Sequence, residues 1–298
     1  MRVLCKPVMI MFLFGLCMLF LETAYAGTVM PVFVSIVPQK YFVEKIGGTL
    51  VNVSVMVKPG ANPATYEPKP RQMVALSRTN LYFAIGVPFE KVWLKKIAAA
   101  NPKMRIVNIQ EGIIKIPMET HRKHGEEHHK RTYNQIVNDP HIWLSPTLVK
   151  IQVRNILKAL VVVDQANKSA YEAGYKKFII EIENLDSELK GIFTGKGARA
   201  EFMVFHPSWG YFARTYGLKQ IPVEIEGKDP KPADLHRLIK YAKKLGVKVI
   251  FVQPQFSFIN ASVIAQAIGG QIAFADPLAL NWPENLRQVA TKFKDTLR

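Results

Sequence analysis

Short β-branched runs alternate with amphipathic helical segments along most of the chain, and this rhythm constrains the fold more than any other feature. In the first half, strands are predicted at residues 32–37, 51–57, 81–86 and 104–109. Helical segments are predicted at residues 40–46, 71–77 and 89–99. A hydrophobic period that switches repeatedly between 2 and 3.6 is typical of a parallel α/β layer.

The second half repeats the rhythm. Strands are predicted at residues 202–205, 220–225, 247–252 and 271–275. Helices are predicted at residues 211–216, 233–245 and 261–268, with a terminal helix from about residue 284. The chain therefore contains two similar α/β units of four strands each.

Residues 146–192 between these units carry no strand signal. One helix is predicted at residues 147–162 and a long charged helix at residues 169–192, which is too polar for a core strand. We therefore expect an α/β fold of two parallel-sheet lobes joined by a long rigid helix, with a ligand-binding cleft between the lobes. The expected domains are an N-terminal lobe (27–145), a helical connector (146–192) and a C-terminal lobe (193–298).

The N-terminus resembles a secretory signal peptide. Arg2 and Lys6 precede an apolar run at residues 8–21, and an A-x-A pattern ends at Ala26. We expect cleavage after residue 26 and a periplasmic, extracytoplasmic location. Both cysteines, Cys5 and Cys17, lie in the segment to be removed. Any transition-metal site in the mature chain must therefore use His, Asp, Glu or water.

The formal charge of +17 could indicate a nucleic-acid partner. The Lys and Arg residues are, however, spread along the whole chain, and no aromatic-basic nucleic-acid motif accompanies them. We therefore expect a solvated basic surface and no nucleic-acid partner.

Three polar residues lie at positions where an open parallel sheet binds ligands. His206 and Asp276 directly follow predicted strands, and His141 ends the first lobe just before a helix. Two imidazoles and a carboxylate from separate segments are ligands that Zn²⁺ or a neighbouring divalent ion takes. We expect His141, His206 and Asp276 to bind one metal ion.

At this point the chain resembles the ZnuA-like solute-binding proteins of bacterial zinc and manganese ABC transporters. The matching segments, in order, are SIVPQKYFVEKIGG, VMVKPGANPATYEPKPRQM, DPHIWLSP, FHPSWGYFARTYGL, IEGKDPKPADL, IFVQPQFS and FADPLA. The resemblance implies two α/β lobes with the metal in the cleft, held by three histidines and one carboxylate. It assigns His141 and His206 to the second and third histidines and Asp276 to the carboxylate.

The first histidine of that pattern is missing. The family text is similar to GA-D/N-PHTYEP, whereas this chain reads GANPATYEP, with Ala64 at the histidine position. An alanine methyl group cannot coordinate a metal. Water, Glu67 or a histidine from the loop at residues 121–131 could take the fourth position.

Four of the seven histidines lie in the segment HRKHGEEHHKR at residues 121–131. A purification tag, a solvated charge run and a metal-collecting loop are the competing interpretations. The family often carries a His-rich insertion here, so we interpret His121, His124, His128 and His129 as an auxiliary metal-capturing loop.

The expected function is that of an extracytoplasmic receptor that binds Zn²⁺ and delivers it to an ABC transporter permease, acting as a monomer and not as an enzyme. A manganese- or iron-binding receptor of the same family is one alternative, although Mn²⁺ prefers more oxygen ligands. A zinc-dependent hydrolase that uses the open coordination position is another. Against it, the chain has no HExxH motif, and Glu67 is the only obvious general base.

Overall fold

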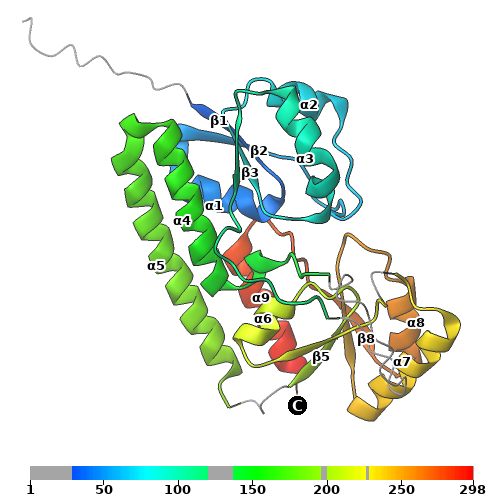
Figure 1. Cartoon of the computed structure of the whole chain (residues 1–298). Helices are drawn as coiled ribbons and strands as arrows, with labels where there is room; N and C mark the ends of the chain where they lie inside the picture. Colours follow the sequence, from blue (N-terminus) through cyan, green and yellow to red (C-terminus); the bar gives the residue numbers. More distant parts are fainter. Residues whose placement is uncertain (1–28, 120–136, 196–199, 226–227, 298) are drawn as a thin grey trace, which may run out of the picture.

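The computed structural model describes residues 29–119, 137–195, 200–225 and 228–297, and within them two α/β lobes lie alongside a pair of helices (Figure 1). The first sheet contains four parallel strands in the order β2-β1-β3-β4. Its strands are β1 (Met30–Val34), β2 (Val51–Val55), β3 (Leu81–Ala84) and β4 (Arg105–Asn108). Its helices are α1 (Val37–Gly47), α2 (Pro70–Leu76) and α3 (Pro88–Ala100).

The second sheet repeats this topology, with four parallel strands in the order β6-β5-β7-β8. Its strands are β5 (Glu201–Val204), β6 (Lys219–Pro222), β7 (Val249–Val252) and β8 (Gln271–Phe274). Its helices are α6 (Gly210–Thr215), α7 (Pro232–Leu245), α8 (Ile259–Ala267) and α9 (Trp282–Thr296). In both sheets the strand order reverses beside the first strand, which creates a switch point where open α/β sheets bind ligands.

The connector is a pair of packed helices, α4 (Pro146–Val163) and α5 (Lys168–Phe193), that runs along one side of both lobes (Figure 1). These helices and the two parallel sheets confirm the expected fold class. None of the helices in the described residues is long and apolar enough to span a bilayer.

Alternating residues of β5 pack into two different cores. Phe202 and Val204 contribute to a large core that also includes the first sheet, α4, α5 and α9. Met203 packs on the other face of the sheet with α7 and α8. This division follows from the two-residue period of a strand whose two faces are both covered by helices.

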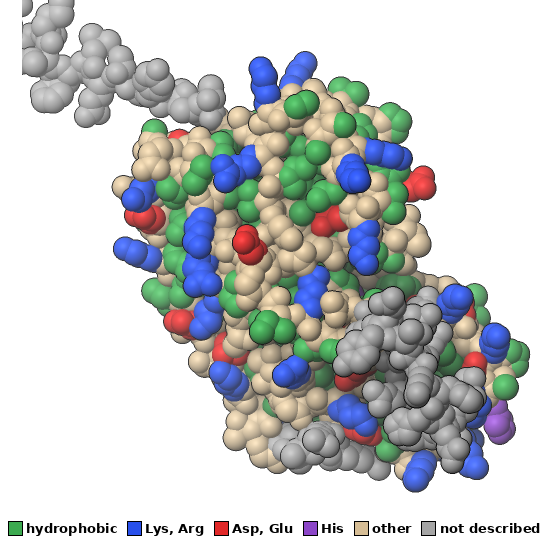
Figure 2. Space-filling view, viewed as in Figure 1, with side chains coloured by type: hydrophobic (Ala, Val, Ile, Leu, Met, Phe, Trp, Pro, Cys, Tyr) green, Lys and Arg blue, Asp and Glu red, His purple; other side chains and the backbone are tan. Residues whose placement is uncertain are grey.

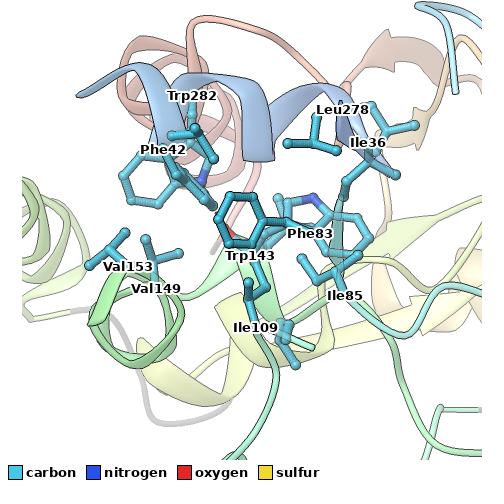
Figure 3. Close-up of a cluster of buried hydrophobic side chains, with 14 of the residues drawn as sticks. Ile36, Phe42, Phe83, Ile85, Ile109, Trp143, Val149, Val153, Leu278 and Trp282 are labelled. Carbon is cyan, nitrogen blue, oxygen red and sulfur yellow. Dashed lines mark hydrogen bonds between the residues drawn. The ribbon is translucent and has the colours of Figure 1, made fainter. Parts of the chain in front are cut away.

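The large core continues across the junction between the lobes (Figure 3). The indole of Trp143 donates a hydrogen bond to the Pro277 carbonyl at 2.7 Å, and the indole of Trp282 donates one to the Trp143 carbonyl at 2.7 Å. Phe42 of α1 packs edge-on against Trp282, with 5.2 Å between ring centroids. The two lobes therefore share one hydrophobic core close to the cleft.

The basic residues do not form a single patch on the face drawn in space-filling form. Lys and Arg side chains are scattered over both lobes there (Figure 2). This distribution agrees with the expected solvated basic surface.

Candidate metal site in the cleft

A pocket of about 480 Å³, counting the space at its mouth, lies at the carboxyl ends of strands from both sheets. The N-terminal lobe contributes the loop after β2 and the start of α3 to its wall. The opposite wall comes from the segment before α4 and from the loops after β5, β7 and β8. The lining residues are Asn62, Pro63, Ala64, Val87, Pro88, Met118, Pro140, His141, Trp143, His206, Gln255, Phe256, Pro277 and Leu278.

His141 is oriented by a carboxylate two residues earlier in the chain. Oδ1 of Asp139 accepts a hydrogen bond from the His141 backbone N–H at 2.8 Å and lies 2.7 Å from Nδ1 of its ring. Asp139 is fully buried, and its other oxygen faces Gly210, where an added Cβ would lie 2.7 Å from Oδ2. The short loop therefore fixes this imidazole with Nε2 as the nitrogen left for a ligand.

His206 is oriented by a carboxylate from the neighbouring strand. Its Nδ1 lies 2.6 Å from Oε2 of Glu224, which is 5% exposed and lies two residues beyond the end of β6. The backbone of His206 is held by the side chain of Gln253 through hydrogen bonds at 3.2 and 2.8 Å. The ring of Phe256 stacks on the imidazole, with 4.5 Å between centroids.

The two imidazoles are spaced as ligands of one ion. Their ring centroids lie 5.3 Å apart, with 73° between the ring planes. Two histidines bound to one tetrahedral Zn²⁺ through nitrogens at about 2.0–2.1 Å would have ring centroids roughly 5 Å apart. Burial lowers the pKa of His141, and the charge of Asp139 offsets this only in part. The neutral ring is therefore favoured, which is the form that binds metal.

Asp276 lies behind the wall of the pocket. Its Oδ1 accepts hydrogen bonds from Nε2 of Gln255 at 2.8 Å and from the Leu278 backbone N–H at 2.9 Å. Gln255 itself lines the pocket, and its Oε1 is buried without a hydrogen-bond partner in the described part of the chain. Asp276 therefore contacts a pocket-lining residue without lining the pocket itself.

No group of three His, Cys, Asp and Glu side chains in the described ranges is close enough to hold a metal ion without rearrangement. The structure thus brings His141 and His206 together. Asp276 does not line the pocket, but it is hydrogen-bonded to Gln255, which does. Glu67 is exposed and does not line the pocket, whereas Ala64 does. His121, His124, His128 and His129 lie outside the described residues, as does the expected signal peptide.

Comparison with known proteins places the chain in a family. A family model described as the periplasmic component A of the zinc-uptake complex matches residues 32–296. The chain belongs to the ZnuA family.

Relatives of known structure support the same assignment. The chain is 44% identical to a protein whose crystal structure is described as ZnuA, with a TM-score of 0.84, over 91% of this chain and 100% of that one. It is also 44% identical to a ZnuA deletion mutant with zinc bound, with a TM-score of 0.82, over 90% of this chain and 98% of that one. The high-affinity zinc-uptake protein ZnuA of Bacillus subtilis strain 168 is 29% identical over 238 residues, or 78% of this chain and 74% of that protein.

Membership of the ZnuA family makes the chain the metal-binding component of a zinc-uptake transporter of the ABC type, and not an enzyme. The hydrolase alternative therefore does not hold. The family is periplasmic, and solved relatives that share the fold include manganese-bound and cadmium-bound proteins.

Asp139, Glu224 and Gln255 were not predicted as site residues. Asp139 could have been found because it precedes His141 by two residues in the segment DPH. Glu224 was placed inside a predicted strand at residues 220–225, but β6 ends at Pro222 and leaves this carboxylate beyond the strand end. Neither Asp139 nor Glu224 would itself bind the metal, so a search of the sequence for spaced metal ligands does not find them.

Proposed function

We propose that the cleft binds Zn²⁺ through Nε2 of His141 and Nε2 of His206, with Asp276 as the carboxylate ligand. The observation that carries this proposal is the pair of imidazoles, with 5.3 Å between centroids and both Nδ1 atoms held by buried carboxylates. This arrangement holds both rings in the tautomer that binds a metal before the ion arrives. Less ordering free energy is then lost on binding.

Zinc is the favoured ion because the two oriented donors are nitrogens. Imidazole is a good ligand for Zn²⁺, whereas Mn²⁺ is better served by carboxylates, carbonyls and water. Asp276 has to join the two histidines, and it is already held by a residue of the pocket wall, Gln255. A shift of the segment around Asp276 would bring its carboxylate forward.

In this proposal the mature protein, released by cleavage after residue 26, works as an extracytoplasmic monomer. It delivers the ion to the membrane permease of its transporter. The His-rich loop at residues 121–131 collects additional ions, and its sites are weaker than the cleft site, where two imidazoles are already oriented.

Zinc titration by calorimetry tests the ligand assignment. The starting protein is a variant, called the four-asparagine variant, in which asparagine replaces His121, His124, His128 and His129. These replacements prevent the loop from binding zinc during the titration. When added to this variant, either His141→Ala or His206→Ala should weaken zinc binding by more than roughly 10–100-fold. That range is typical when the mutated residue only hydrogen-bonds to a metal ligand. His236→Ala serves as the control, because His236 is exposed on α7 and does not line the pocket.

Unchanged affinity in both alanine variants would contradict the assignment. Titration with Mn²⁺ in parallel compares the two ions. Tighter binding of Zn²⁺ is expected at most protein sites, so a Mn²⁺ affinity equal to or above that for Zn²⁺ is the outcome that would favour the manganese alternative.

A further inference from the structure

Among the described residues, the pocket wall formed by the loop after β2 and the start of α3 has no imidazole or carboxylate. It consists of Asn62, Pro63, Ala64, Val87 and Pro88. The only polar side chain among these five is that of Asn62, and its Oδ1 accepts a hydrogen bond from the Ala64 backbone N–H at 2.8 Å. Both imidazoles that line the pocket in the described part of the chain therefore lie on the opposite wall.

A zinc ion on that opposite wall would keep an open coordination position. Zinc takes four ligands in most protein sites. His141, His206 and Asp276 provide at most three, so at least one position remains, on the side of the pocket that Ala64 occupies.

The pocket has more room than an ion and a water molecule need. The space open to the centres of water-sized spheres in the pocket is about 70 Å³, several times the roughly 10–15 Å³ that one water molecule needs. Apart from the polar groups already named, its lining is aliphatic, proline or aromatic. An apolar body with one donor atom would fill this space better than water.

The charge around the site favours a neutral donor. Asp139 and Glu224 are buried behind the two histidines, and Asp276 lies behind Gln255. Lys115 lies close enough to interact electrostatically with Asp139 and His141. Three carboxylates balance the charge of this lysine and one Zn²⁺, so a further carboxylate or phosphate would add an unbalanced negative charge to a poorly solvated site.

We propose that the pocket binds zinc together with one small, neutral nitrogen donor of the imidazole class, seated against Ala64. The donor completes the coordination from the side where the family pattern has a histidine. The proposal rests on the proposed zinc site, and it adds a second ligand to it.

The test is the zinc affinity of the mature four-asparagine variant, measured by competition with a chromophoric chelator with and without free imidazole. The free zinc concentration is corrected for its complex with imidazole. Imidazole should tighten zinc binding by about tenfold or more, a factor equivalent to about 1.4 kcal/mol. The visible spectrum of Co²⁺ bound in place of zinc should change when imidazole is added.

Two variants at position 64, made in the four-asparagine variant, serve as matched controls. Ala64→Leu fills the space without adding a donor, and Ala64→His supplies a tethered one, so imidazole should tighten zinc binding in neither. No tightening with Ala64, or equal tightening with Ala64→Leu, would overturn the proposal. The proposed zinc site is tested separately, without imidazole. If the four-asparagine variant binds zinc and adding His141→Ala removes that binding, the zinc site stands even when imidazole has no effect.

The unaltered mature chain distinguishes free imidazole from the chain's own. If it binds zinc tightly and does not respond to imidazole, while the four-asparagine variant does respond, a loop histidine occupies the position in the unaltered chain. That outcome overturns the proposal of a free ligand.

Discussion

At the scale of single residues, the two histidines could be predicted from the sequence, whereas the groups that orient them could not. A parallel α/β pattern locates strand ends, and His206 lies at one of them. The contact between His206 and Glu224 depends on the pairing of β5 with β6, in which Val204 lies opposite Pro222. That register places two residues 18 positions apart side by side, and no local pattern in the sequence shows it.

Replacing Glu224 tests whether the carboxylate behind His206 matters. Glu224→Gln keeps the size of the side chain but removes the charge that favours a proton on Nδ1, so zinc affinity should fall by about 10–100-fold. Calorimetric titration measures the change. Glu201→Gln is a matched control, because Glu201 pairs with Lys219 on the same two strands, away from the pocket. Equal affinities for the two variants would show that Glu224 does not tune the site.

Restoring the missing histidine should tighten zinc binding. In the four-asparagine variant without added imidazole, Ala64→His supplies a ligand that the fold holds at the pocket wall, so the affinity should rise at least about tenfold, or roughly 1.4 kcal/mol. Pro63 and Tyr66, on either side, keep the family text. Unchanged affinity in the titration would mean that another group, such as Glu67, already fills the fourth position, or that residue 64 turns away from the ion.

At the scale of secondary-structure elements, each predicted strand and helix is present in the structure, but several ends differ. The first strand was predicted to reach residue 37, whereas β1 ends at Val34 and α1 begins at Val37. The side chain of Gln39 accepts a hydrogen bond from the Ile36 backbone N–H at 3.0 Å and donates one to the Phe83 carbonyl at 2.9 Å. This contact with the neighbouring strand starts the helix early, and hydrophobic periodicity does not reveal it.

Two glycines of α5 should respond in opposite ways to alanine. A Cβ on Gly174 would lie 2.4 Å from the Ile46 carbonyl oxygen, because α5 packs closely on the end of α1. Gly174→Ala should therefore reduce the free energy of unfolding by roughly 1–3 kcal/mol. Gly191 is exposed on the same helix and has no atom within 4 Å of an added Cβ. Gly191→Ala should be neutral or raise the free energy of unfolding by up to about 1 kcal/mol. Urea unfolding curves compare the two, and a stable Gly174→Ala protein would contradict the close packing.

The His-rich loop should add zinc ions without creating the primary site. Changing His121, His124, His128 and His129 to asparagine should lower the number of zinc ions bound per chain and leave one, because Asp139 and Glu224 already orient the two imidazoles of the cleft. Elemental analysis after equilibrium dialysis gives the count. If all binding disappears, the loop is the main source of ligands.

At the scale of the whole molecule, the sequence predicted two lobes, a helical connector and a cleft site, but not the contacts that join the lobes. Trp143 and Pro277 are 134 residues apart, and Trp282 reaches back to Trp143 across 139 residues. Both contacts belong to a core that includes strands of both sheets and borders the pocket, since Trp143 and Leu278 also line it. The expected lobe boundaries at residues 145 and 192 remain a prediction.

The position of zinc in crystals of the mature four-asparagine variant, located by anomalous diffraction at the zinc absorption edge, is the direct test of the proposed site. One strong peak is expected in the cleft, about 2.0–2.1 Å from Nε2 of both His141 and His206 and with Asp276 as the third protein ligand. A peak that lies away from either imidazole, or the absence of a peak in the cleft of zinc-saturated crystals, would contradict it.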